Sequence, residues 1–134
     1  MISETQESGT KRRVKKDTSE RGGHSFKDYF KRATSQMLVL LLLKEEAMYV
    51  YQLASELGKR SKNSYTMSFL YPVLYRLESL GYVAESHKEI SEGNRVRNYY
   101  EITEAGREYL EKILSEYDDM LEAVQQIRNY KKES

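Results

Sequence analysis

The sequence comprises 134 residues with no cysteine and a formal net charge of +1, from 22 Lys and Arg against 21 Asp and Glu. This length suits one folded domain with an additional element, and the lack of cysteine excludes disulfides and thiolate catalysis. The longest apolar run, residues 37–43, is much shorter than the roughly 20 residues of a membrane-spanning helix. No apolar segment of a signal peptide follows the basic residues near the N-terminus, so we expect a cytoplasmic protein without a membrane partner.

The net charge near zero does not exclude a nucleic-acid partner, because the charges separate along the chain. Residues 1–46 carry ten Lys or Arg and seven Asp or Glu, residues 47–102 carry seven and six, and residues 103–134 carry five and eight. The net charges of these parts are therefore +3, +1 and −3. Attraction to phosphate is local, since it falls off within a Debye length of roughly 8 Å at physiological salt.

Residues 1–25 are rich in Ser, Thr, Gly, Glu and Lys and contain almost no large apolar side chain. Burial therefore cannot offset the entropy lost on ordering them, and we expect a disordered, basic N-terminal arm. Its basic cluster, Lys11 to Lys16, either adds non-specific affinity for DNA or is simply solvated. The sequence favours neither interpretation.

Helical periodicity begins at Phe26, and a first helix is expected from there to about Lys44. The apolar residues that recur at helical spacing are Phe26, Tyr29, Phe30, Ala33, Met37, Leu40 and Leu41. A second short helix is expected over Tyr51, Leu53, Ala54 and Leu57, with Gly58 ending it. The polar residues 59–67 then form a connector, in which Lys62 is a candidate phosphate contact.

A third helix is expected after Ser68, whose hydroxyl can cap its first turn. Its apolar residues Leu70, Val73, Leu74 and Leu77 recur at helical spacing, and Gly81 supplies the left-handed residue that ends it. Two strand-like runs follow, Tyr82 to Ile90 and Arg95 to Ile102, around the polar turn 91–94. A helix followed by a hairpin with a basic tip is typical of the recognition helix and wing of a DNA-binding regulator.

The last helix is expected to begin at Thr103, which can cap it, and to contain Gly106 as a local weakness. Its apolar residues step by three and four, forming a heptad seam over about 28 residues. This surface exceeds what one small domain covers, which predicts a partner helix from a second copy; the alternative is an intramolecular pairing with the first helix alone. The expected dimer interface comprises Leu110, Ile113, Leu114, Tyr117, Met120, Leu121, Val124 and Ile127.

Two motifs in this order resemble the PadR family of winged helix-turn-helix transcriptional regulators. The first is Leu-Tyr-Pro-Val-Leu-Tyr-Arg-Leu-Glu at residues 70–78, followed by Leu-Gly-Tyr-Val at residues 80–83. The second is Gly-Asn-Arg-Val-Arg-Asn-Tyr-Tyr at residues 93–100, followed by Thr-Glu-Ala-Gly-Arg at residues 103–107. The resemblance covers roughly residues 35–130.

The resemblance implies a mainly α fold with a small β-hairpin. It implies a winged helix-turn-helix domain over residues 26–102, a single C-terminal dimerisation helix over residues 103–130 that swaps across a homodimer, and a tail at residues 131–134. The chain departs from the family at three points. Phe69 stands where the family commonly has a glycine near the helix start, and Tyr117 stands where multidrug-binding relatives carry a tryptophan. Before the second helix, where family members often have a Gly-Tyr pair, this chain has Met-Tyr-Val-Tyr at residues 48–51.

The residues expected to contact double-stranded DNA belong to the connector, the third helix and the second hairpin strand. They are Lys62, Ser68, Tyr71, Arg76, Arg95, Arg97, Asn98 and Tyr99. Alternation along the second strand sets Val96, Asn98, Tyr100 and Ile102 on a packing face and Arg95 and Arg97 together on the other. Such an arginine pair suits phosphate or the minor groove, whereas the plain alternative is a solvated hairpin.

Two of these residues have specific alternatives. Tyr71 lies near the start of the expected recognition helix, where side chains meet phosphates and base edges, or it is a partly buried aromatic beside Pro72. Arg76 reaches a phosphate or pairs with a nearby carboxylate. Pro72 is structural, since first-turn N–H groups lack partners in a helix.

We expect no enzyme, no cofactor and no metal site, because the two histidines lack a metal-ligand spacing and no glycine-rich phosphate loop is present. The predicted function is a sequence-specific regulator, a repressor, that binds a palindromic operator as a homodimer. A small apolar or aromatic effector is a further possible partner, with Tyr117 and Met120 either lining its pocket or serving as core. The alternatives are a winged-helix module that binds protein, or a ligand-binding dimer without specific DNA binding.

Overall fold

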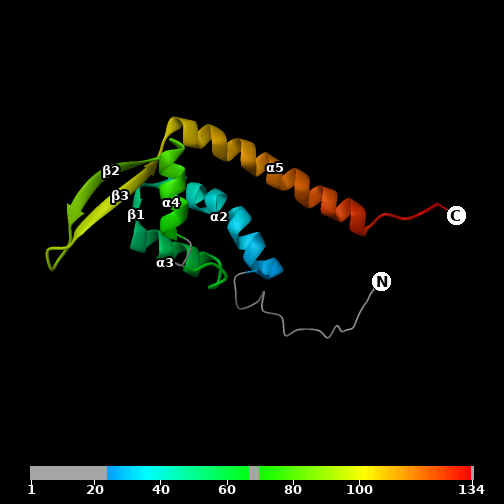
Figure 1. Ribbon diagram of the computed structural model, residues 1–134, viewed down its shortest axis with the longest axis horizontal. Helices are drawn as coiled ribbons and strands as arrows, with labels where there is room; N and C mark the ends of the chain where they lie inside the picture. Colours follow the sequence, from blue (N-terminus) through cyan, green and yellow to red (C-terminus); the bar gives the residue numbers. More distant parts are fainter. Residues whose placement is uncertain (1–23, 67–69, 134) are drawn as a thin grey trace, which may run out of the picture. The chain divides into compact units, whose positions relative to one another are not determined.

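The structure is a computed structural model that describes residues 24–66 and 70–133. Its elements in chain order are α2 (Phe26–Glu45), β1 (Met48–Tyr49), α3 (Val50–Arg60), α4 (Leu70–Ser79), β2 (Val83–Ile90), β3 (Val96–Ile102) and α5 (Glu104–Arg128) (Figure 1). The fold is mainly α with a small antiparallel sheet, as the sequence predicted. The expected N-terminal arm falls almost entirely outside the described residues, as do Ser68 and Phe69.

The chain divides into two units, one ending at Ala33 and one beginning at Thr34. The described part of the first unit is the start of α2, where the Asp28 backbone N–H donates to the Ser25 hydroxyl at 3.1 Å and caps the helix. Within this segment the Arg32 guanidinium lies 5.1 Å from the centre of the Tyr29 ring.

The core of the second unit forms where α2, α3, α4, the sheet and the start of α5 meet. Leu40, Leu53, Leu74 and Leu77 are fully buried, and Leu110 of α5 joins them at 1% exposure. The remaining large side chains that are almost completely enclosed are Val39, Leu43, Met48, Leu70 and Val83. The apolar run of α2 and the periodic residues of α4 are therefore core.

The expected end of the second helix at Gly58 is wrong, because α3 continues to Arg60. The left-handed residues lie later, at Lys62 with φ 54° and Asn63 with φ 66°. The Asn63 N–H donates to the Gly58 carbonyl at 2.7 Å, which closes the turn beyond the helix. Glycine costs a helix only about 1 kcal/mol relative to alanine, so the buried side of α3 carries the helix past it.

Gly81 ends α4, as predicted, with φ 83°. The Gly81 N–H donates to the Glu78 carbonyl at 3.0 Å and the Tyr82 N–H to the Leu77 carbonyl at 2.9 Å. This pair of hydrogen bonds satisfies carbonyls that a helix end leaves unpaired and turns the chain directly into β2.

The sheet has three strands in the order β1-β3-β2, whereas the sequence predicted only the hairpin of β2 and β3. Strand β1 pairs Met48 with Tyr100 and Tyr49 with Tyr99. Two residues are too short to show a strand periodicity, so only tertiary pairing defines this strand. The hairpin turn is as expected, with Gly93 and Asn94 at φ 84° and 62°.

Thr103 caps α5, as predicted, by accepting a hydrogen bond from the Gly106 N–H at 3.0 Å. The Thr103 hydroxyl also donates to the Gly81 carbonyl at 2.7 Å, which joins the end of α4 to the start of α5. Gly106 was expected to be a weakness, but a Cβ there would clash with the Tyr82 carbonyl oxygen and lie 2.8 Å from Ile102 Cγ1. The glycine allows the helix to approach the start of the hairpin closely.

Candidate nucleic-acid interface

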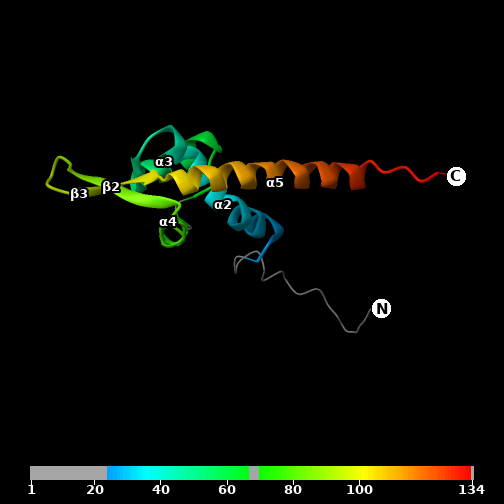
Figure 2. The ribbon, with the colours of Figure 1, turned by 90° about the horizontal axis from the view of Figure 1, so that it is seen from above.

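A groove of about 640 Å³ lies between α4, the start of α3 and the outer part of the hairpin. The β2–β3 hairpin extends beyond α3 and α4 in Figure 2, and residues of its outer part line one side of the groove. The residues that line the groove are Tyr49, Val50, Tyr51, Tyr71, Tyr75, Arg95, Val96, Arg97, Asn98 and Tyr100. Its lining is therefore aromatic on the helix side and basic on the hairpin side.

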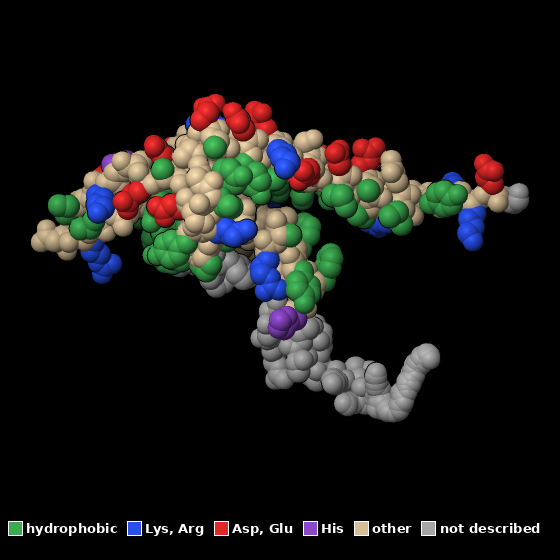
Figure 3. Space-filling view, turned by 45° about the horizontal axis from the view of Figure 1, so that its top comes forward, with side chains coloured by type: hydrophobic (Ala, Val, Ile, Leu, Met, Phe, Trp, Pro, Cys, Tyr) green, Lys and Arg blue, Asp and Glu red, His purple; other side chains and the backbone are tan. Residues whose placement is uncertain are grey.

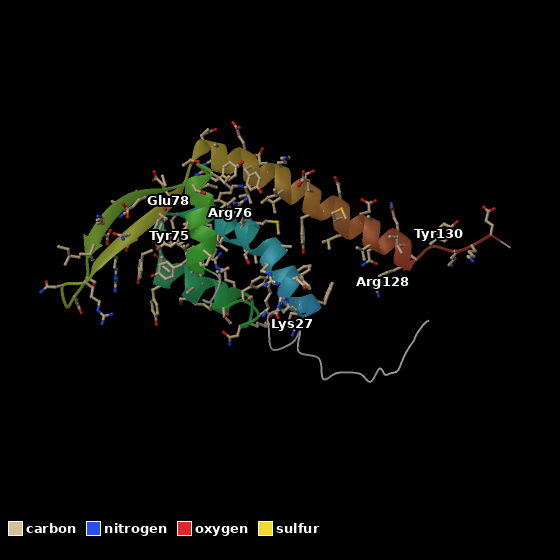
Figure 4. The ribbon with its side chains drawn as sticks, in the orientation of Figure 1. Lys27, Tyr75, Arg76, Glu78, Arg128 and Tyr130 are labelled. Carbon is tan, nitrogen blue, oxygen red and sulfur yellow. The ribbon has the colours of Figure 1, made fainter. Side chains whose placement is uncertain are left out.

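The exposed face of α4 supplies two tyrosines to this groove. Tyr71 and Tyr75 are 48% and 57% exposed, and their ring centres lie 6.0 Å apart. Residues four apart share a helix face, and Leu70, Leu74 and Leu77 hold the opposite face in the core. Figure 4 shows Tyr75 pointing from α4 toward the hairpin.

Five tyrosines line the groove, and of these only Tyr71 was among the expected DNA contacts. Tyr75 was not singled out as a DNA contact, although its spacing of four from Tyr71 predicts that the two rings share a face. Tyr51 was assigned to the apolar pattern of the second helix, but its side chain is 67% exposed and faces the groove. The exposed start of α3 therefore adds to the aromatic wall.

Tyr100 anchors β3 in the core. Its ring is 7% exposed, and burial raises the pKa of its hydroxyl, with a further contribution from the charge of Glu78 on α4. Because β3 is anchored at this residue, its outer part is held beside the exposed tyrosines of α4.

The predicted alternation along β3 is correct only near the helices. Tyr100 and Ile102 are buried, but Val96 is 62% exposed and Asn98 is also exposed. The outer part of the hairpin extends past α3 and α4, as Figure 2 shows. Val96 and Asn98 therefore line the groove instead of the core.

Arg95 and Arg97 are exposed and both line the groove. The Arg97 guanidinium lies 4.5 Å from the centre of the Tyr49 ring. In the described parts of the chain, neither arginine forms an ion pair with a carboxylate. Both cations are therefore available to a polyanion.

Other predicted contacts lie away from the groove lining. Tyr99 is not among the lining residues, and its ring stacks on that of His87 with the ring centres 4.5 Å apart. Burial raises the pKa of Tyr99, and a hydrogen bond with Glu89 raises it further. Arg76 and Lys62 are exposed outside the groove, and no described carboxylate pairs with Arg76, while Ser68 lies outside the described residues.

Arg60, which is also outside the groove lining, is paired with carboxylates, whereas Arg95 and Arg97 are not. Its guanidinium donates to Glu45 at 2.7 and 2.9 Å and to Glu56 at 2.9 Å. The hydrogen bond with Arg60 lowers the pKa of each glutamate, and the two carboxylates raise that of Arg60. Figure 3 shows basic side chains near the hairpin tip and acidic ones along α5, which gives the second unit opposite charges in these regions.

The predicted dimer surface on α5 divides into a packed and an exposed part. Leu110 is buried, and Ile113, Leu114 and Tyr117 pack partly against the core. The later members of the seam are largely exposed: Met120 63%, Leu121 44%, Val124 48% and Ile127 78%. Pairing within the chain therefore covers only the first half of the seam.

No helix within residues 24–66 and 70–133 combines the length and apolar character needed to cross a membrane. Over the same ranges, His, Asp and Glu side chains form no group of three or more that suits a metal ion.

The model of the transcriptional regulator PadR-like family matches residues 39–112, which is more than half of the chain. A Lysinibacillus sphaericus protein described as "Uncharacterized protein X" is 30% identical over 89 residues, which cover 65% of this chain and 81% of that protein.

Solved structures of transcriptional regulators have the same fold. A PadR family transcriptional regulator from Eggerthella lenta is 28% identical with a TM-score of 0.68, and the match covers 77% of this chain and 88% of that one. A transcriptional regulator from Clostridium thermocellum is 24% identical with a TM-score of 0.67, over 77% and 99% of the two chains. With its winged helix-turn-helix fold and its match to the family over residues 39–112, the chain belongs to the PadR-like family of transcriptional regulators.

Proposed function

We propose that this PadR-like regulator recognises a specific DNA duplex through the groove between α4 and the hairpin. The observation that carries the proposal is that exposed aromatic side chains and arginines line the same groove. The exposed tyrosines Tyr71 and Tyr75 lie on α4, and the unpaired cations Arg95 and Arg97 lie on the hairpin. Base readout needs a surface that enters a groove of DNA, and orientation on the duplex needs phosphate contacts beside it.

In this proposal α4 enters the major groove with the aromatic face that begins at Tyr71. Tyrosine hydroxyls can hydrogen-bond to base edges or phosphates, and the rings can pack against thymine methyl groups. Arg95 and Arg97 bind phosphates or the adjacent minor groove from the hairpin. Arg95 and Arg97 are the charged residues that line the protein's groove. Specificity in this proposal therefore depends on the tyrosines and Asn98 more than on attraction to phosphate.

The active form in this proposal is a homodimer joined through the exposed half of the α5 seam. A stripe that includes Met120, Val124 and Ile127 leaves large apolar side chains in solvent, and pairing with the same stripe of a second copy would cover them. Two wings related by a two-fold axis then read the two halves of a palindrome.

Repression follows if the operator overlaps a promoter, because the bound dimer then excludes transcription machinery from the same DNA. A small apolar or aromatic effector would release the dimer by binding beside Tyr117 and Met120. Tyr117 is partly buried at the edge of the core and Met120 is exposed on the next turn, so both lie where a partner helix would meet α5. Such a ligand acts only if it binds one arrangement of the wings more tightly than another.

The test is selection of bound duplexes from a random library at two salt concentrations, with the oligomeric state measured on the same sample. We expect a palindrome bound by a dimer. The double substitution R95E/R97E should lower affinity for the recovered site by at least about a hundredfold and reduce its salt dependence.

A matched control reverses two exposed charges on α5, in the variant R107E/K112E, which changes the net charge equally. This control should retain most of the specific affinity. Weak, sequence-blind binding that salt removes, or equal losses in both variants, would contradict the proposal and favour a protein partner or a ligand for the aromatic groove.

A further inference from the structure

We propose that Tyr49 of β1 is a positioning residue for Arg97, holding its guanidinium at the groove without neutralising it. This inference rests on the proposed DNA binding and names a residue that completes the basic wall. The Arg97 guanidinium carbon lies 4.5 Å from the centre of the Tyr49 ring, within the range of a cation–π interaction. Both residues line the groove.

The sheet register brings the two residues together. Tyr49 pairs with Tyr99 of β3, and Arg97 lies two residues before Tyr99 and thus on the same sheet face. The rings of Tyr49 and Tyr99 meet edge to face with centres 5.3 Å apart, which fixes the orientation of the Tyr49 ring. Through Tyr49, the short strand β1 therefore places an aromatic ring against Arg97 of the hairpin.

The nearest candidate to capture Arg97 is Glu89, its direct partner across the hairpin. That carboxylate is engaged elsewhere, since His87 Nε2 lies 3.1 Å from Glu89 Oε2 and the Tyr99 hydroxyl also hydrogen-bonds to Glu89. His87 is held in turn by its stack on Tyr99 and by Ser86, whose hydroxyl lies 2.7 Å from His87 Nδ1. Glu89 consequently forms no ion pair with Arg97 in the described structure.

Whether Arg97 can still bind a phosphate depends on whether its partner is a carboxylate or an aromatic ring. A carboxylate would cancel the charge of Arg97 and occupy its N–H donors, as Glu45 and Glu56 do to Arg60. An aromatic face attracts the cation but leaves both its charge and its in-plane donors free. Arg97 is therefore held in place and remains able to bind a phosphate.

A double-mutant cycle on the full-length protein tests this inference, using the selected operator duplex. The variants are Y49L, Y49F, R97Q and Y49L/R97Q, with affinity measured over a range of salt and thermal unfolding measured for each. We expect Y49L to weaken binding about two- to fivefold, Y49F to bind like wild type, and R97Q to reduce the salt slope by about one. In the R97Q background, Y49L should cause no further loss.

The outcomes separate the inference from the proposed function. If Y49L lowers the affinity for DNA by the same factor with and without Arg97, the positioning role would be overturned. Normal binding by Y49L while R97Q binds weakly would also overturn it. Specific DNA recognition would stand in both cases. Full affinity of R97Q would overturn the role of Arg97 in binding and this inference with it, whereas the proposed function would stand. If wild type recovered no duplex, the proposed function would be overturned as well. If Y49L lowers the melting temperature, Y49V, which suits a strand, replaces it in the same cycle.

Discussion

Gly106 lies where the first turn of α5 passes the start of the hairpin. A side chain there would collide with the Tyr82 carbonyl oxygen, which accepts the N–H of Thr103 at 3.0 Å, and with Ile102. We predict that G106A lowers the free energy of unfolding by about 1–3 kcal/mol, because backbone and a buried side chain must move. Urea unfolding followed by circular dichroism measures this change.

Gly58 provides the matched control within α3. A Cβ at Gly58 would meet Asn63 Oδ1 at 3.4 Å, an ordinary contact, and alanine favours a helix by about 1 kcal/mol. G58A should therefore leave stability unchanged or raise it. Equal destabilisation by both substitutions would show that close approach at Gly106 is not the cause.

At the scale of single residues, the sequence predicts positions whose roles depend on local hydrogen bonds. Gly81 and Thr103 were identified correctly because helix caps use neighbours in the chain. The expected helix end at Gly58 was wrong, because the helix continues to Arg60. The close approach of Tyr82 to Gly106 was not foreseen, because Tyr82 is distant in the sequence. A single sequence does not distinguish a glycine that ends a helix from a glycine that allows another backbone segment to pack closely.

At the scale of elements, α5 joins a half anchored in the core to a half that is exposed. We predict that M120E/V124E raises the dimer dissociation constant by at least about a hundredfold, since each apolar side chain that a dimer buries contributes roughly 1.5–3 kcal/mol. The monomer should keep its helical content, because Leu110 still anchors the first half of α5. Analytical ultracentrifugation and circular dichroism measure the two effects.

The control for this prediction is S115E/Q126E, which adds the same charge on the face of α5 opposite to the seam. It should remain dimeric at the same concentration. A wild-type monomer at tens of micromolar, or equal dissociation of both variants, would argue against the seam as the interface.

The elements themselves were largely predictable, because α2, α4 and α5 show helical periodicity and the hairpin shows turn residues between strand-like runs. Strand β1 and the bulge that shifts the register between Glu85 and His87 were not foreseen. Both depend on which residues pair across the sheet, and pairing between distant segments leaves no periodic signal in either one.

At the scale of the whole molecule, a dimer with a fixed distance between its wings requires half-sites on the same side of the duplex. We predict that inserting five base pairs, about half a helical turn, between the half-sites reduces affinity to that of a single half-site. Electrophoretic mobility shifts with the selected operator measure this loss.

The control keeps the spacer length and changes only its sequence, and it should have a small effect. Undiminished binding after the insertion would indicate wings that move independently, and the fixed-spacing proposal would then be dropped.

The sequence by itself determined the fold class, the family resemblance and the order of helix, hairpin and C-terminal helix, because these follow from periodicity, caps and motifs within short segments. It also predicted that Tyr71, Arg95 and Arg97 belong to one functional surface. Only the tertiary structure decided that Tyr51 and Tyr75 join this surface, that Arg76 and Lys62 lie outside the groove, and that Tyr49 supports Arg97. These relations arise where segments far apart in the chain meet, so no single segment carries them.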